Sequence, residues 1–175
     1  MFTRNWYKAL STEMSRVNDT FQSVTGITQT LSASAYLFGI MLNEDNRYTP
    51  SIYKVRTTLD SDGGVIFGTG NATPTIDDTT LSGNLVSGFS YNSSVSAKRG
   101  GDGVTITALY TVINNNEEAI TISEVALIAN LYNNNTQAMY KGLLDRTVLD
   151  TPVTIPAGGV GQVVYTITFN YLTAT

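Results

Sequence analysis

The fold is decided by residues 104–132, VTITALYTVINNNEEAITISEVALIANLY. Two runs rich in β-branched residues flank the polar turn NNNEE at 114–118. In the first run every second residue is apolar, among them Ile106, Ala108 and Tyr110, so that one side faces a core. This pattern predicts two strands joined by a hairpin of the longer-loop kind.

In the second run the apolar residues switch from even-numbered to odd-numbered positions part-way along. Ile120 and Ile122 fall on even positions, whereas the apolar residues from Val125 to Leu131 fall mainly on odd positions. A shift of one residue turns every side chain of a strand to the opposite face of the sheet. We therefore expect a β-bulge near Ser123–Glu124 that restores the core-facing side.

Other segments add further strands separated by turn motifs. Strands are expected at 51–59, at 65–67, at two short stretches within 84–98 interrupted by Gly88, at 138–144, at a short edge segment 152–155 and at 163–171. Loops or turns are expected at 43–50, 60–64 (DSDGG, as a hairpin turn), 68–83, 98–103, 133–136 and 156–161. This spacing predicts an all-β fold, which we expect to be an antiparallel β-sandwich of the jelly-roll or Ig-like type.

The N-terminal segment has the spacing of an amphipathic helix over residues 2–17. Apolar side chains recur there every three or four positions, at Phe2, Trp6, Leu10, Met14 and Val17. The helix is expected either to lie across the sheet or to serve as an arm that docks on another subunit. We expect residues 1–50 to form a helical arm with an extended segment, and residues 51–175 to form the sandwich domain.

The composition excludes several kinds of active site. The chain has no histidine and no cysteine, which rules out disulfides, zinc sites built on these residues, and Ser-His or Cys-His nucleophile pairs. Only 14% of the residues are charged and the net charge is −4, so no basic surface for nucleic acid is expected. No apolar run reaches the roughly 18–20 residues of a membrane-spanning helix, and the N-terminus lacks the pattern of a signal peptide.

Calcium and phosphate binding are the first alternatives to weigh. Asp60 and Asp62, with the glycines after them, resemble the start of a calcium loop, but the twelfth position is Asn71 instead of a bidentate glutamate. The GTG motif at 68–70 opens no expected helix and is not followed by Lys-Ser/Thr, so it does not predict a phosphate loop. A plain turn at 60–64 is therefore expected, and no metal or cofactor.

Carboxylate chemistry is the remaining catalytic alternative. Asp77 and Asp78 are adjacent, so along an extended chain their side chains point apart. A glycosidase would need one of them to pair with a distant carboxylate such as Glu124 or Asp145. Capping of a short turn by Asp77 or Asp78 is the expected role instead.

Aromatic residues leave a binding role open. Ten tyrosines and Trp6 are enough for a carbohydrate-binding platform. However, Tyr110, Tyr165 and Tyr171 fall on the expected core-facing positions of their strands. Core packing is therefore expected for these three, and recognition of carbohydrate on a host surface is kept as the alternative function.

Three blocks of the sequence resemble a known group of proteins. They are GTGNATPTIDDTTLSGNLV (68–86), NNNEEAITISEVALIANL (114–131) and LLDRTVLDTPVTIPAGGVGQVVYTITF (143–169). In this order they are similar to small virion structural proteins of tailed bacteriophages, a group that includes capsid accessory, head-fibre, neck and tail components. Ala126 departs from the pattern, because a glycine is usual at that position.

The resemblance implies a non-enzymatic structural subunit, located in the virion and present in many copies. It implies no catalytic residues. No cofactor is expected, and the charge and the apolar pattern described above predict no contact with nucleic acid or membrane. The expected partners are capsid, neck or tail proteins and further copies of the chain. Aromatic anchors usually dominate interface energy, and the expected contact elements are the N-terminal arm and the 68–83 loop, with the candidate interface residues Phe2, Trp6, Leu10, Met14, Thr69, Pro74 and Asp77.

Overall fold

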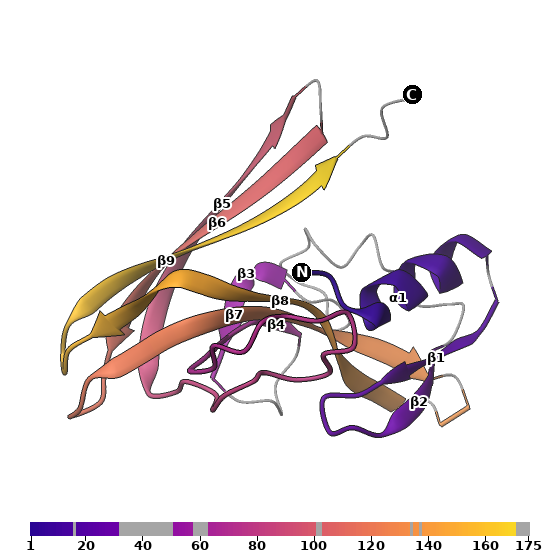
Figure 1. The fold of residues 1–175 in the computed structure, drawn as a ribbon, viewed down its shortest axis with the longest axis horizontal. Coiled ribbons are helices and arrows are strands. Elements are labelled where there is room, and N and C mark those ends of the chain that lie inside the picture. The colour runs from indigo at the N-terminus through magenta and orange to yellow at the C-terminus, as the bar shows by residue number, and fades with distance from the viewer. Residues whose placement is uncertain are drawn as a thin grey trace. The chain divides into compact units, whose positions relative to one another are not determined.

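The computed structural model describes residues 1–15, 17–31, 51–57, 63–100, 103–133, 135–136 and 138–170 (Figure 1). The described part of the chain is mainly β-structure, in nine strands, and it contains one helix. It forms two compact units. Unit 1 comprises residues 1–87 and 121–152, and unit 2 comprises residues 88–120 and 153–175. The expectation of a predominantly β fold is therefore confirmed.

Unit 1 contains a four-stranded sheet. Its strands, in the order β3-β4-β7-β8, are β3 (Ser51–Arg56), β4 (Gly64–Gly68), β7 (Ile120–Asn133) and β8 (Ala138–Ile155). The strands expected at 51–59, 65–67 and 138–144 are thus present. The edge segment expected at 152–155 is the end of β8, which runs on without interruption.

The hairpin expected at 60–64 is wrong. Strands β3 and β4 pair in parallel, with Val55 opposite Val65 and Arg56 opposite Ile66. The antiparallel partner of β4 is β7, on its other side. A turn motif indicates a local change of direction, but it does not determine which strand edge is then used for pairing. The possible calcium ligands Asp60 and Asp62 lie outside the described residues.

Strand β7 bears on two further expectations, the bulge near Ser123–Glu124 and the hairpin at 114–118. Every residue from Ile122 to Leu131 is buried, so both faces of this strand contribute to the interior. A change of apolar parity therefore does not require a bulge. The pairing of β7 with β4 is regular from Glu124 to Ile128, and a bulge near Ser123–Glu124 stays a prediction. The turn at 114–118 does not close a hairpin either, because the sheet neighbours of β7 are β4 and β8.

Unit 2 contains an antiparallel three-stranded sheet. Its order is β5-β6-β9, with β5 (Phe89–Arg99), β6 (Gly103–Asn114) and β9 (Val160–Asn170). The expected alternation is confirmed, since the buried residues of β6 and β9 include Ile106, Ala108, Tyr110, Val112, Val163, Tyr165 and Ile167. The two short strands expected within 84–98 are one continuous strand, β5.

The N-terminal segment forms α1 (Arg4–Ser15) and a hairpin of β1 (Asp19–Gln22) and β2 (Thr28–Leu31) that the sequence pattern does not predict. The expected helix is confirmed, but its buried side differs, consisting of Asn5, Trp6, Ala9 and Thr12. Val17 follows the helix and is 64% exposed, so it is not part of the apolar stripe. The buried side of α1 keeps the three- and four-residue spacing of a helix face, but two of its residues, Asn5 and Thr12, are polar.

The N-terminus is attached to β8 within unit 1. The Thr3 amide donates to the Leu144 carbonyl at 2.9 Å, and the Thr3 hydroxyl donates to the Leu143 carbonyl at 2.5 Å. The expected division into 1–50 and 51–175 does not follow the compact units, because the described part of the first fifty residues lies in unit 1. Independent folding of residues 51–175 stays a prediction. The loop expected at 43–50 lies outside the described residues.

Gly88 provides a test of the turn that precedes β5. Its φ of 73° lies in the left-handed region, and a Cβ there would collide with the side chain of Asn116. We expect Gly88→Ala to cost about 1–2 kcal/mol for the backbone conformation and about 1–3 kcal/mol more for the displaced Asn116. Thermal and urea unfolding measure the loss.

Gly158→Ala is the matched control for this prediction. Gly158 has a φ of 66° in the same unit, but nothing lies within 4 Å of a Cβ placed there. It should therefore show the backbone cost alone. Equal losses in the two variants would contradict the steric role of Asn116.

Candidate functional site

A long loop of residues 69–87 covers one face of the unit 1 sheet, and we call it the covering loop. It starts directly after β4, and its ends are close together because the Thr69 amide donates to the Asn84 carbonyl at 3.0 Å. Leu81 of the loop packs on the sheet in a buried apolar cluster with Ile66, Ala126, Ile128 and Leu143. The long polar loop expected at 68–83 is thus confirmed, and it is a compact Ω-type loop.

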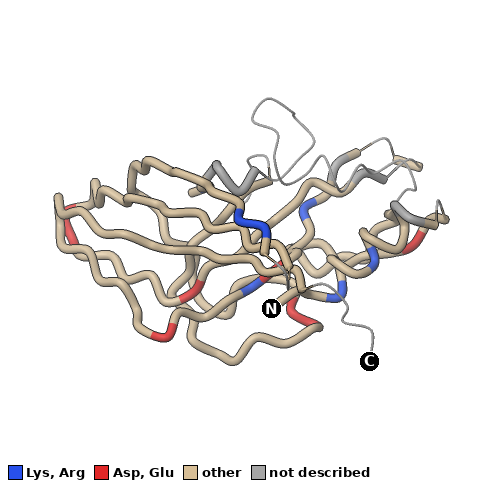
Figure 2. Tube along the Cα trace, turned by 90° about the horizontal axis from the view of Figure 1, so that it is seen from above, with Lys and Arg blue, Asp and Glu red and all other residues tan. Residues whose placement is uncertain are grey.

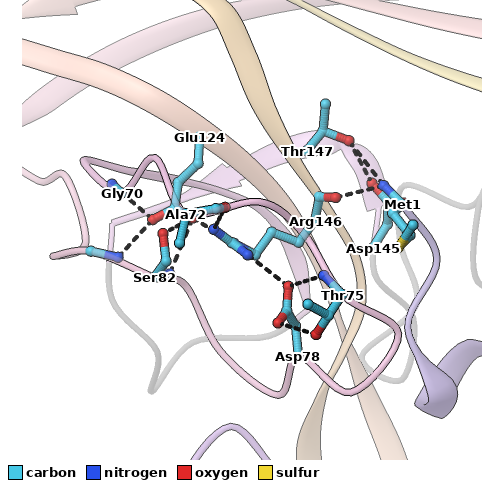
Figure 3. A network of polar contacts seen from close by, with 11 residues as sticks. Met1, Gly70, Ala72, Thr75, Asp78, Ser82, Glu124, Asp145, Arg146 and Thr147 are labelled. Atoms are coloured by element: carbon cyan, nitrogen blue, oxygen red, sulfur yellow. Dashed lines mark hydrogen bonds and ion pairs between the residues drawn. The ribbon is translucent and has the colours of Figure 1, made fainter.

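A single buried carboxylate, that of Glu124, ties this loop to the sheet (Figure 3). Its Oε1 accepts hydrogen bonds from the amides of Gly70 and Gly83, both at 2.9 Å. Its Oε2 accepts from the Ser82 amide at 3.1 Å and the Ser82 hydroxyl at 3.2 Å. Backbone N–H groups that converge in this way form an anion-binding concavity. Here the anion comes from the protein's own strand β7.

Arg146 of β8 is the second anchor. The side chain is buried, and its Nε donates to Glu124 Oε2 at 2.6 Å. Nη1 donates to Asp78 Oδ2 and Nη2 to the Ala72 carbonyl, each at 2.6 Å. The planar guanidinium therefore links β7, the start of the loop and its central turn in three directions. We call Glu124, Arg146 and Asp78 the clamp.

Asp78 joins the clamp through a turn. Its carboxylate accepts from the Thr75 amide at 2.9 Å and from the Thr75 hydroxyl at 2.7 Å. Turn capping, the role expected for Asp77 or Asp78, is thus confirmed for Asp78. Asp77 is 68% exposed and forms a surface ion pair with Arg4 at 2.7 Å. The two neighbours accordingly serve different contacts.

The clamp residues are all ionised. Burial alone would raise the pKa of Glu124, but the hydrogen bonds from Arg146, Ser82 and Gly83 and the positive charge of Arg146 lower it below its ordinary value. Burial likewise opposes ionisation of Asp78, but the bonds from Thr75 and Arg146 outweigh it, so the pKa of Asp78 is also lowered. For Arg146 burial would lower the pKa, but contacts with both carboxylates raise it.

This geometry fixes a conformation and leaves no clamp residue poised for acid–base chemistry. A general acid needs a carboxyl that is protonated near the working pH, whereas Glu124 is held ionised. Both of its oxygens are already engaged by donors from the protein. The distant pairing considered for a glycosidase does bring Asp78 and Glu124 near each other, but Arg146 lies between them as the shared partner.

The GTG motif has a structural explanation in this site. A Cβ at Gly68 would lie 2.6 Å from Glu124 Oε1, and one at Gly70 would collide with Ser82 and Gly83. Both glycines are therefore needed for the close approach of the loop backbone to the carboxylate. The motif cradles an internal anion in place of a phosphate. Sequence reasoning missed this because the carboxylate is 54 residues away along the chain.

Asp145, the other carboxylate considered for catalysis, has a separate role. It is buried, and its Oδ1 lies 3.0 Å from the Met1 ammonium, which also donates to the Arg146 carbonyl at 2.5 Å. Figure 3 shows this contact beside the clamp. Asp145 thus fastens the N-terminal segment to β8, next to the residue that fastens the covering loop.

The candidate interface residues lie in different environments. Phe2 stacks on Trp6 with ring centres 4.5 Å apart, and Trp6 is buried within unit 1. Leu10 and Pro74 are half-buried, Thr69 and Asp77 are exposed, and the side chain of Met14 lies outside the described set. A shallow cleft of about 60 Å³ between α1, β1 and the 76–79 turn includes Arg4 and Asp77 among its lining residues. The structure therefore brings the helix and the covering loop together, but not all candidates are at the surface.

Comparisons with known proteins give no assignment. No protein-family model, no curated protein and no solved structure matches this chain. Among the described residues there is no cluster of three or more acidic, histidine or cysteine side chains suited to a metal ion, and no helix with the length and apolar character to span a membrane. The site is therefore interpreted from its own geometry.

The clamp predicts a large cost for removing its central charge. Glu124→Gln keeps the shape of the side chain but leaves Arg146 buried without its charged partner. We expect a loss of about 3 kcal/mol in the free energy of unfolding, the lower end for a broken buried ion pair. Glu117→Gln, an identical change at an exposed residue, is the control. Equal stability of the two variants in urea titrations would refute the clamp.

The lowered carboxyl pKa values also predict the dependence of stability on pH. A group whose pKa is lower in the folded state stabilises the fold above its unfolded pKa, about 4 for these carboxyls, and this contribution is lost as the pH falls through the folded value. The free energy of unfolding of the native chain should thus fall steeply below about pH 4.

Asp78→Asn tests this dependence with a milder change than a substitution at Glu124. It should give a shallower decline of stability in the acid range, because one of the linked protonations is removed. Asp150→Asn, the same change at an exposed residue of β8, should keep the native slope. Parallel curves for native chain and Asp78→Asn would show that Asp78 is not coupled to folding.

Proposed function

We propose that this chain is a non-enzymatic structural subunit of a tailed-phage virion, working in many copies. The observation that carries the proposal is the composition of the clamp. Its parts come from all three blocks that resemble phage virion proteins: the covering loop from the first, Glu124 from the second and Arg146 from the third. The motif residues thus serve one architectural purpose, the fixation of a loop on a sheet.

The absence of an enzymatic role is part of the same proposal. It is supported by the contacts of the buried charged residues in unit 1, which are bonded to one another, to loop amides or to the N-terminal ammonium. Glu124, Arg146 and Asp145 each have internal partners that fix them in place. A scaffold that presents a rigid surface needs this kind of arrangement, whereas a catalyst needs groups that reach a substrate.

The finer description of the fold also belongs to the proposal. A β-sandwich of jelly-roll or Ig-like type is supported by the high strand content and by the antiparallel sheet of β5, β6 and β9. The parallel pairing of β3 with β4 departs from a purely antiparallel pattern. Contacts with neighbouring subunits are proposed for the N-terminal segment and the covering loop, where Thr69 and Asp77 are exposed.

Carbohydrate recognition, the alternative function, has weaker support. Tyr110 and Tyr165 are buried in unit 2, as expected, and are not available for a platform. Among the aromatic side chains that the structure describes, Tyr7 is the one in the exposed class, at 52%. A sugar-binding platform requires several exposed rings.

The proposed location predicts that the chain is a stoichiometric part of purified particles. Tailed particles from the source of the gene would be purified by density gradient, and their proteins quantified by mass spectrometry with immunogold labelling. We expect a constant, integral copy number relative to the major capsid protein and label at one station of the particle. A chain that stays in the unassembled fraction after lysis would contradict the proposal.

A further inference from the structure

One side of the unit 2 sheet is open to solvent along its length, with exposed residues on both outer strands and half-buried ones on the central strand. The opposite side carries the buried row of Tyr110, Tyr165 and their neighbours, so the open side carries the alternate residues of each strand. We call it the open face. It consists of Ser90, Asn92, Ser94, Ser96 and Lys98 of β5, Thr105, Thr107, Leu109, Thr111 and Ile113 of β6, and Val160, Gln162, Val164, Thr166 and Thr168 of β9.

Apolar side chains occupy two positions along this face. Val160 is 62% exposed and Val164 is 56% exposed. The strand register places Val160 opposite Ile113 and Val164 opposite Leu109, and the polar pair of Gln162 and Thr111 lies between them on the same face. Directly opposite residues of an antiparallel pair have Cβ atoms about 5 Å apart, so each of the two is an apolar contact, one at the start of β9 and one near the middle of the face.

The open face is also nearly without charge. Lys98, at one end of β5, is its one charged residue, and serine, threonine, asparagine and glutamine supply its polar groups. Figure 2 shows how sparse charges are along the described chain. Depletion of charge around exposed apolar side chains is typical of the core of a protein interface.

We propose that the open face binds the open face of a second copy of this chain. The chain has a net charge of −4, so two copies carry net charge of the same sign. The open face carries no acidic residue, and two copies can meet there without opposing carboxylates. With the strands of the copies running in opposite directions, the two Lys98 side chains lie at opposite ends of the contact.

The dimensions of the face fit such a contact. Three strands of about 11 residues form a face about 14 Å wide and about 37 Å long, or about 500 Å² per copy. The pair then buries about 1,000 Å², which is the minimum for a biological interface and lies in the range of weak, reversible contacts. Sheets that pack face to face lie about 10 Å apart, a spacing that valine, leucine and threonine side chains fill.

This inference deepens the proposed function, since it names a surface through which copies assemble. It does not depend on the virion: a monomeric chain that is nevertheless a particle component would refute the open-face contact and leave the proposed function standing. Absence from particles together with a dimer in solution would refute the proposed function and leave the open-face contact standing.

Sedimentation equilibrium of the full chain tests the inference. We expect a reversible dimer for the native chain, and a dissociation constant raised roughly tenfold or more by Val164→Lys, which places a charge beside Leu109 near the middle of the open face. Val17→Lys is the matched control, because Val17 has similar exposure, at 64%, and the substitution adds the same charge in unit 1. It should leave association unchanged or strengthen it.

Circular dichroism and thermal unfolding of both variants establish that each is folded. Since the chain has no cysteine, a nitroxide label can be attached at a single site, through Ser96→Cys on the open face or Ser11→Cys on α1. Concentration-dependent immobilisation of the label at position 96 but not at 11 is expected. A monomeric native chain, or equal weakening by the two lysine substitutions, would overturn the inference.

Discussion

The structure of unit 1 depends on one buried interaction, the contact of the Glu124 carboxylate with Arg146 and with the amides of the covering loop. A loop without regular structure has no ladder to satisfy its backbone N–H groups when it packs on an apolar sheet. Here a carboxylate on β7 accepts three of them. A buried ion pair adds little net stability over a well-packed apolar pair. The main effect of the Glu124–Arg146 pair is therefore to select one conformation of the covering loop.

The choice of residues in the clamp follows from geometry. A lysine at 146 would offer a point charge, whereas the arginine fork reaches Glu124, Asp78 and the Ala72 carbonyl at the same time. Glycine at 68 and 70 removes the side chains that would keep the loop away from the carboxylate. Each of these residue types therefore has a separate physical reason. Replacement of Arg146 removes contacts of the clamp, whereas replacement of either glycine prevents the close approach of the loop to the carboxylate.

Much of the strand pattern is predictable from sequence, but its pairing is not. Alternation in residues 104–113 and 163–169 depends on local side-chain period, and the structure confirms the buried rows there. The hairpin expected at NNNEE is wrong because the partners of a strand are determined by long-range packing. For the clamp a signal does exist: Glu124 and Arg146 are charges placed among apolar residues, and a charge at a buried strand position is nearly always paired. The identity of the partner requires the fold.

The two sheets differ in whether the chain covers their outer faces, and this difference explains the residue composition of each sheet. In unit 1 the chain supplies its own cover, so β7 is buried on both faces and apolar throughout from Val125 to Ile128. In unit 2 the open face has no cover among the described residues, and its threonines and serines keep it compatible with water. A sheet that had to remain solvated permanently would gain from charges, which oppose edge and face association. The open-face contact proposed above accounts for their absence beside Val160 and Val164.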